Sequence, residues 1–403
     1  MRAHTIPLAC LRLRYVHHSA AVAILVGAVA VGAGCAPLTP PFQLHGPVPP
    51  PSDADAFEAA LFQTTGAHLR GGQRWRLEDD GHVFAALVDD IGRARTSVNI
   101  VSYIWHSGEP SDRIVAALEK RAHGVACRIL ADPLGSPDFV DQVQPRLRAA
   151  GCATLMFRPL HDHALPERNH RKLAIIDGRV GYVGGFGIRH EWVKASGSRD
   201  PEWRDINLRI EGAAAADLQR AFAQNWQEAG GELLPVEDFP RIEPDGDARV
   251  AFVSSSFAYV TEADRLTFLT VAAAKKRLWI WNAYFAPDDH LSKLLADKAR
   301  AGVDVRILMP GDKNDVTASK IAQRRSYPPL ARAGVRLFEY QPTMMHAKSM
   351  IVDDRLAVVG SINLDALSLT RLEEDAVVVD DPALVAALAR DWDEDMTHSR
   401  PVQ

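Results

Sequence analysis

The sequence predicts an α/β fold of two pseudo-symmetric lobes, each a mixed β-sheet flanked by helices, with one shared active site at their interface. The first observation behind this prediction is a constellation that occurs twice in 403 residues, as His170, Lys172 and Asp177 and again as His346, Lys348 and Asp353. In both copies the lysine follows the histidine by two positions, the aspartate by seven and a glycine by fourteen. Such matched spacing is hard to reach by chance, so we interpret the copies as two halves of one active centre.

The second observation is that the expected secondary structure repeats. In the first half we expect a helix over residues 82–94, a buried strand over 97–105 and a helix over 113–124. In the second half the same order is expected over residues 265–276, 277–285 and 291–302. Strands that alternate with helices imply a largely buried mixed sheet in each lobe.

The chain is expected to divide into four segments. These are a signal segment (1–34), a Pro-rich extended tether (35–53), a first lobe (54–235) and a second lobe (236–403). The Gly- and acid-rich stretch 229–247 is the expected boundary between the lobes.

The signal segment has a positive leader with Arg2, Arg12 and Arg14, followed by 16 uncharged residues (19–34). This stretch is too short for a comfortable membrane span. It ends in VGAGC, which resembles a bacterial lipoprotein signal with Cys35 as the lipidated residue, although Gly32 stands where leucine is usual. We expect an exported, membrane-attached lipoprotein that faces the periplasm; ordinary cleavage or a retained anchor are the alternatives.

The two remaining cysteines, Cys127 and Cys152, lie in the expected first lobe. We expect two buried thiols that act as small apolar residues, with a disulfide possible in an oxidising compartment.

Each motif reads as a strand, a tight turn and a second strand. Side chains two positions apart share a face of a strand, so each histidine should lie on the same side as its lysine. Asp177 and Asp353 are at an odd offset from their histidines and beside a turn signal, so we expect them to hold the hairpin turns rather than touch substrate.

These residue types suit two-step phosphoryl transfer. A neutral imidazole can attack phosphorus, and a second imidazolium can protonate the leaving alkoxide. Two lysines can neutralise the phosphate oxygens, so we expect no cofactor and no metal. A formal net charge of −5 and a pI near 6.3 argue against a general nucleic-acid binder.

At this point the chain resembles the phospholipase D superfamily, whose signature is this histidine, lysine and aspartate pair. The resemblance extends from about Leu69 to Thr397 and includes blocks similar to those of bacterial cardiolipin synthases: TSVNIVSYIW, GVACRILAD, RLWIWNAYFAPDD, GVDVRILMPGDKND and AGVRLFEY. It implies that His170 is the nucleophile and His346 the general acid, and that Asp205 and Glu374 orient the two histidines.

The chain departs from the family at identifiable positions. The family's first motif ends in GGxN, but Gly187 stands here in place of the asparagine, whereas the second copy keeps Asn363. Leu367 and Leu372 replace a family arginine and asparagine. The two half-sites should therefore not be equivalent.

The resemblance implies a phosphatidyltransferase of the cardiolipin synthase type that acts on phospholipid at a membrane surface as a monomer, with no nucleic-acid partner. A phospholipase D hydrolase is the main alternative, a nuclease is less favoured, and a lipid-binding protein with a decayed site conflicts with the intact motifs. We expect loops after Tyr103 and Tyr284, including Trp105, Phe285 and Pro287, to wall the entry to the site, and Trp279 and Trp281 to be strand core.

Overall fold

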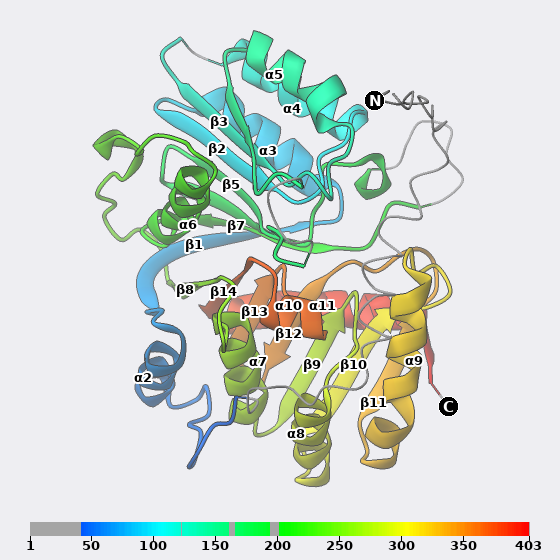
Figure 1. Ribbon diagram of the computed structural model, residues 1–403. Coiled ribbons are helices and arrows are strands. Elements are labelled where there is room, and N and C mark those ends of the chain that lie inside the picture. Colours follow the sequence, from blue (N-terminus) through cyan, green and yellow to red (C-terminus); the bar gives the residue numbers. More distant parts are fainter. Residues whose placement is uncertain (1–41, 122, 161–165, 194–200, 403) are drawn as a thin grey trace, which may run out of the picture.

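The computed structural model describes residues 42–121, 123–160, 166–193 and 201–402. Within these ranges a single 15-stranded mixed sheet runs through the molecule, in the order β15-β11-β10-β9-β12-β13-β14-β8-β1-β7-β6-β5-β2-β3-β4 (Figure 1). The long strand β1 (Arg70–Asp79) joins the two halves of the sheet, because its beginning pairs with β8 and the rest pairs with β7.

The first half lies on the β7 side of β1. Its other elements are α3 (His82–Arg93), β2 (Ser97–Ser102), α4 (Glu109–Lys120), β3 (Ala126–Ala131), η1 (Phe139–Val143), α5 (Gln144–Ala149), β4 (Ala153–Met156), β5 (Lys172–Ile176), β6 (Val180–Gly184), η2 (His190–Trp192), β7 (Ile206–Glu211) and α6 (Ala215–Glu228).

The second half follows the short helix η3 (Val236–Asp238). Its elements are β8 (Ala248–Ser255), α7 (Glu262–Ala273), β9 (Arg277–Asn282), α8 (Asp289–Arg300), β10 (Asp304–Pro310), α9 (Thr317–Arg332), β11 (Arg336–Tyr340), β12 (Lys348–Val352), β13 (Leu356–Gly360), α10 (Ala366–Thr370), β14 (Glu374–Asp380), α11 (Pro382–Thr397) and β15 (Ser399–Pro401).

The strand order shows that the second half repeats the first. Strands β2 and β9 each lie between a parallel strand and the first strand of a motif hairpin, with Ser102 paired to Lys172 and Asn282 paired to Lys348. The predicted α/β architecture of two pseudo-symmetric lobes is therefore confirmed, and the motif lysines begin equivalent strands.

Three apolar cores support this arrangement. One lies under α3, α4 and α5 in the first half, and a second lies under α7, α8 and α9 in the second half (Figure 1). The third core is shared by both halves and includes α6 and α11, with Leu173 and Trp281 as examples from either side. Because this core is continuous, the two motif hairpins are held at a fixed relation to each other.

The N-terminal part of the predicted first lobe belongs elsewhere. Helix α2 (Ala54–Thr65) buries Phe57 and Leu61 in the core of the second half, beside α7. The prediction that the first lobe begins at residue 54 is wrong in this respect, because the apolar face of α2 finds its partner across the boundary. The predicted boundary stretch 229–247 does lie between α6 and β8.

The predicted extended tether is also packed over its described part. Phe42, Leu44 and Val48 are partly buried against the core of the second half, and the Phe42 ring meets the Phe268 ring edge-on at 6.2 Å. The segment is Pro-rich but carries enough apolar side chains to bind the surface of the domain. The predicted signal segment and Cys35 lie outside the described residues, and no helix within them is long and apolar enough to cross a membrane.

Cys127 and Cys152 form a disulfide, with their Cα atoms 4.6 Å apart. The expectation of two free thiols is therefore wrong. Cys127 lies on β3 and Cys152 immediately precedes the neighbouring strand β4, so parallel pairing of these strands brings the two thiols together.

Candidate active site

The two motif histidines lie where the halves of the molecule exchange backbone hydrogen bonds. The His170 N–H donates to the carbonyl of Glu373 at 2.9 Å, and the His346 N–H donates to the carbonyl of Arg204 at 2.6 Å. Glu373 immediately precedes Glu374, and Arg204 immediately precedes Asp205, the two carboxylates that the family resemblance singled out. The pseudo-twofold arrangement therefore places each histidine against the other half of the chain.

The carboxylates follow the same exchange. His170 Nδ1 lies 2.9 and 3.0 Å from the two Glu374 oxygens, and His346 Nδ1 lies 3.5 Å from Asp205 Oδ2. Asp205 immediately precedes β7 and Glu374 begins β14, and the two occupy equivalent places in the two halves. The structure thus places Glu374 in contact with His170 and Asp205 beside His346, and their role in orienting the histidines stays a prediction.

The motif lysines lie beside their own histidines. Lys172 Nζ donates to the His170 carbonyl at 2.6 Å, and Lys348 Nζ lies 2.9 Å from Nδ1 and 3.1 Å from Nε2 of His346. The four side chains are closely enclosed, with exposed fractions of 7% for His170, 2% for His346, 0% for Lys172 and 4% for Lys348. Two ammonium groups are thus concentrated around two imidazoles in a site with little water.

Asn363 lies in the same site, on the loop after β13. Its side-chain N–H donates to Ser368 Oγ at 3.3 Å, and its Oδ1 accepts no hydrogen bond from any described residue although the side chain is buried. Gly187 occupies the equivalent position of the first half, so that half has no amide there.

Asp177 and Asp353 lie in the hairpin turns, each with a positive φ, of 55° and 54°. Asp177 accepts three consecutive backbone N–H groups, from Arg95 to Ser97, at the beginning of β2. Asp353 accepts the equivalent three, from Lys275 to Arg277, at the beginning of β9. These carboxylates therefore join each hairpin to its neighbouring strand.

Burial and the lysine charges lower the pKa of both imidazoles well below the usual value, so the resting site holds neutral histidines. Burial also lowers the pKa of Lys172 to about 8 and that of Lys348 to about 7, although the nearby carboxylates oppose this shift. Burial disfavours the charged form of a carboxyl group as well, and it raises the pKa of Glu374 to about 8. A bound phosphodiester anion would favour the cationic forms of the lysines and of one histidine, because it supplies the negative charge that the site lacks.

Sequence reasoning missed two residues that support the orienting carboxylates. Ser361 donates a hydrogen bond from its hydroxyl to Glu374, and the Trp192 indole N–H donates to Asp205 Oδ2 at 2.7 Å. The position of Ser361 in the glycine turn after β13 was a usable signal. Trp192 gave none, because nothing local in the sequence relates it to Asp205.

The walls of the site agree only partly with expectation. The Tyr103 ring contacts the His170 ring edge-on at 5.0 Å, and the Tyr284 ring contacts His346 at 5.9 Å. Trp105 and Phe285, in contrast, are fully buried in the cores, so the prediction that they wall the entry is wrong. Phe285 directly follows Tyr284, and successive side chains of an extended chain point to opposite faces. Trp105 is held in the core by its indole N–H, which donates to Ser111 Oγ at 2.9 Å. Trp279 and Trp281 are strand core, packed on Trp392.

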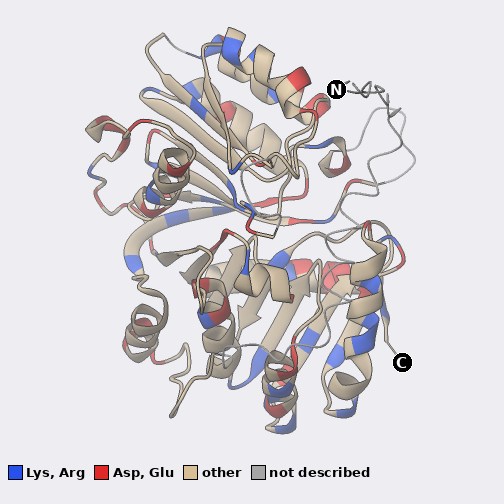
Figure 2. Cartoon of the chain, viewed as in Figure 1, with Lys and Arg blue, Asp and Glu red and all other residues tan. Residues whose placement is uncertain are grey.

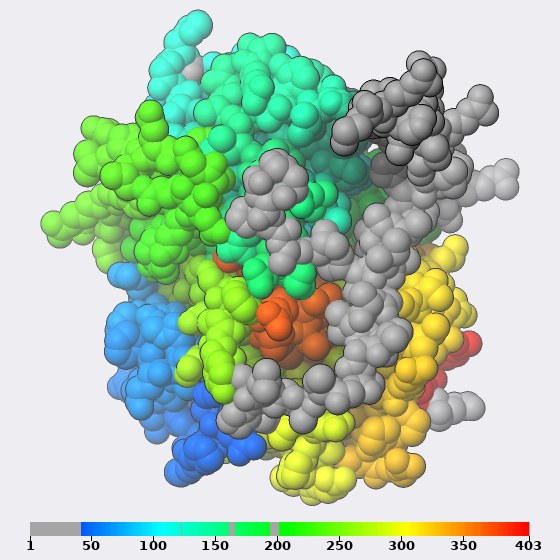
Figure 3. Space-filling view, viewed as in Figure 1, coloured from blue at the N-terminus to red at the C-terminus, as the bar shows by residue number. Residues whose placement is uncertain are grey.

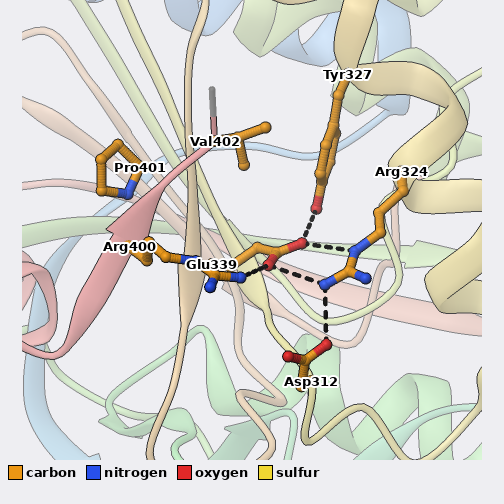
Figure 4. Close-up of a pocket in the computed structure, with 7 residues that line it drawn as sticks. All are labelled: Asp312, Arg324, Tyr327, Glu339, Arg400, Pro401 and Val402. Carbon is orange, nitrogen blue, oxygen red and sulfur yellow. Dashed lines mark hydrogen bonds and ion pairs between the residues drawn. The ribbon is translucent and has the colours of Figure 1, made fainter.

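The surface gives further context. Figure 3 shows the α10 segment (orange) at the boundary between the two halves. Two surface pockets are lined by no motif residue. One, of about 640 Å³, lies between α8 and α9, with Pro287 in its wall. The other, of about 630 Å³, lies among α9, β11 and β15, and its central Glu339 is already bound by Arg324, Tyr327 and Arg400 (Figure 4).

Among the described residues no group of three or more His, Cys, Asp or Glu side chains is arranged to hold a metal ion.

Comparison with known proteins agrees with this geometry. A family model described as "Cardiolipin synthase, PLD-like domain" matches residues 87–226 and 269–396. "Cardiolipin synthase 1" of Bacillus anthracis is 33% identical over 342 residues, which cover 81% of this chain and 67% of that protein. "Cardiolipin synthase A" of Pectobacterium atrosepticum is 32% identical over 334 residues, 80% of this chain and 68% of that protein.

The chain thus spans about two thirds of the length of these relatives. Among solved structures, the phosphatidylserine synthase of Haemophilus influenzae Rd KW20 has the same fold, with a TM-score of 0.67 at 13% identity over 85% of this chain and 91% of that one. With two motif hairpins joined at one site and this extent of similarity, the chain belongs to the cardiolipin synthase family of phospholipase D-like proteins.

Proposed function

We propose that the protein is a phosphatidyltransferase of the cardiolipin synthase type, which moves a phosphatidyl group between alcohols through a phosphohistidine. The observation that carries this proposal is the convergence of two neutral imidazoles and two lysines, with each imidazole facing a carboxylate from the opposite half. The sequence identity of 32–33% to cardiolipin synthases, over about four fifths of this chain, supports a phospholipid substrate.

In the first step His170 attacks phosphorus through Nε2. Its Nδ1 is held by Glu374. The positive charge that forms on the ring as the bond to phosphorus is made favours the ionised form of this buried carboxyl group, and the carboxylate in turn stabilises that charge. The bond from phosphorus to the head-group oxygen breaks at the same time. His346 gives its proton to that oxygen, and the leaving group departs as a neutral alcohol.

In the tautomer with its proton on Nδ1, His346 would donate to the Gly185 carbonyl, which lies 3.0 Å away. This leaves Nε2 of His346 to face the leaving oxygen. Lys172 and Lys348 would neutralise the non-bridging phosphate oxygens, which carry more charge in the transition state, and the Asn363 amide would donate a hydrogen bond to them.

In the second step an acceptor alcohol gives its proton to His346 and attacks the phosphohistidine, which frees His170. Water in place of the alcohol would make the protein a hydrolase by the same intermediate. Enclosure of the four motif side chains restricts water and favours the alcohol. Acidic and basic residues are interspersed over both halves (Figure 2), and this, with the formal net charge of −5, disfavours the nuclease alternative.

We propose further that the protein is exported as a monomer and held at a membrane surface by a lipid on Cys35, which lies outside the described residues. The Cys127–Cys152 disulfide supports export, since disulfides persist in oxidising compartments. Metabolic labelling with a fatty-acid analogue should mark the wild type and not Cys35→Ser. An unlabelled wild type would contradict the lipoprotein assignment.

Incubation of the full-length protein with phosphatidylglycerol vesicles, followed by mass spectrometry of the lipids, tests the activity. We expect cardiolipin and free glycerol, with the same yield in EDTA because lysines supply the positive charge. Phosphatidic acid alone would favour the hydrolase. No turnover of phospholipid together with cleavage of single-stranded DNA would favour the nuclease.

A further inference from the structure

The two orienting carboxylates receive their supporting hydrogen bonds from different kinds of residue. Glu374 is bound by the hydroxyl of Ser361, the first residue after β13. Gly185 occupies the equivalent position after β6 and has no side chain to offer. Asp205 instead accepts from the Trp192 indole at 2.7 Å and from the Ile206 N–H at 2.9 Å.

Two glycines of the first half make room for this different arrangement. A Cβ atom at position 185 would lie 2.3 and 2.7 Å from the Asp205 oxygens. A Cβ atom at position 187 would lie 2.9 Å from both Cη2 and Cζ3 of the Trp192 ring. The carboxylate and the indole therefore occupy the space that the side chains of Ser361 and Asn363 take in the second half.

Trp192 is also in direct contact with the second histidine. It is fully buried, and its ring meets the His346 ring edge-on at 5.0 Å. The ring of Trp203 lies against both, 4.6 Å from Trp192 and 5.6 Å from His346. Since Asp205 is 3.5 Å from His346 Nδ1, beyond ordinary hydrogen-bond length, packing of these rings contributes to the orientation of the imidazole.

We propose that Trp192 is a positioning residue that acts on His346 through Asp205, and that Gly187 replaces the family asparagine so that the indole can take this place. The kinetic part of the proposal rests on the function proposed above. The indole N–H donates to the ionised carboxylate and stabilises its charge, which burial alone would disfavour. An ionised Asp205 in turn stabilises His346 in the protonated form that the general acid needs.

The first test measures the His346 imidazole directly and does not depend on turnover. In protein with ¹³C-labelled histidine, we expect Trp192→Phe to lower the pKa of His346 relative to the wild type. The matched control is Trp105→Phe, which removes another fully buried indole whose N–H donates to Ser111 Oγ at 2.9 Å, in the core under α4. An unchanged pKa of His346 in Trp192→Phe, or the same change in both variants, would overturn the proposal.

The second test asks whether Trp192 acts through Asp205. We expect Trp192→Phe to lower kcat about 10- to 100-fold with little change in KM, and to have no further effect in an Asp205→Asn background. Losses that multiply in the double variant would show that Trp192 acts by another route.

Gly187→Ala supplies a variant that keeps the indole but forces it to move, in case Trp192→Phe does not fold. It should lower the pKa of His346 in the same direction, and a wild-type titration would count against the proposal. If the wild type turns over no phosphodiester, the proposed function fails, while the His346 titration still decides the role of Trp192.

Discussion

The two half-sites share a backbone frame and have a lysine and a tyrosine beside each histidine, but they differ in how the carboxylate and the imidazole are supported. The backbone N–H of each histidine donates to a carbonyl of the opposite half, and each histidine faces an equivalent carboxylate. Among the described residues, His170 has close contacts to both oxygens of Glu374 and one aromatic neighbour, Tyr103. His346 has a longer contact to Asp205 and three aromatic neighbours, Trp192, Trp203 and Tyr284.

This difference teaches that the two halves kept equivalent positions for the imidazoles, lysines and carboxylates, whereas the residues that support the carboxylates differ. A nucleophile gains from a carboxylate that stabilises the charge it acquires. A general acid gains from a fixed orientation toward the leaving oxygen. The closer carboxylate at His170 and the aromatic packing at His346 support the proposal that His170 is the nucleophile and His346 the general acid, which stays a prediction.

The largest expected effect comes from removing either histidine. His170→Ala and His346→Ala should each lower turnover of phospholipid at least about 10⁴-fold, because both steps need both imidazoles. With a p-nitrophenyl phosphodiester, whose leaving group needs no proton, His346→Ala should accumulate a phosphohistidine on His170 and His170→Ala should form none. Peptide mass spectrometry would locate the adduct, and an adduct on His346 in the His170→Ala protein would reverse the two roles.

The two carboxylates should differ in importance. Glu374→Gln keeps the shape of the side chain but removes the charge that stabilises the His170 imidazolium, so kcat should fall about 10³- to 10⁴-fold. Asp205→Asn should cost about 10²-fold, since its contact to His346 is longer and the aromatic rings remain. Steady-state kinetics of both variants would check this order. Equal losses would mean that the difference in geometry has no functional counterpart.

The two halves also differ in a disulfide, which among the described residues only the first half has. The equivalent positions of the second half are the buried Val305 and Val335. Replacing both cysteines with valine should lower the free energy of unfolding by about 3 kcal/mol, as expected from the 25-residue separation of Cys127 and Cys152. Chemical denaturation measures the loss, and the wild type with a reductant should match the variant. Unchanged unfolding would show that the crosslink adds nothing to stability.

The smallest effect is a shift in the pH dependence. Burial lowers the pKa of Lys348 to about 7 and that of Lys172 to about 8, and each lysine is a cation only below its pKa. The kcat/KM of the free enzyme should therefore decline as the pH rises from 7 to 8. Lys348→Arg keeps its charge in this range, so the decline should move toward pH 8 even if the maximum rate is lower. A decline at the same pH in the variant would mean that Lys348 is not the titrating group.

Much of the architecture could be predicted from the sequence. The matched spacing around His170 and His346 predicted two related lobes, and the alternation of apolar segments predicted their strands and helices. These features are encoded locally, by strand periodicity of two and helix periodicity of 3.6 residues. The turn signals at Asp177 and Asp353 were local for the same reason, since a positive φ restricts which residues a tight turn accepts.

Other features were decided only by the tertiary structure. The contact of His170 with Glu374 joins residues 204 positions apart, and the sequence pattern around either one does not contain the other. The same is true of α2 in the second half, of the Cys127–Cys152 disulfide and of the Trp192 contact with Asp205. Each depends on which surfaces meet when the core packs. The order of residue types along the chain does not give the distance in space between residues that are far apart in sequence.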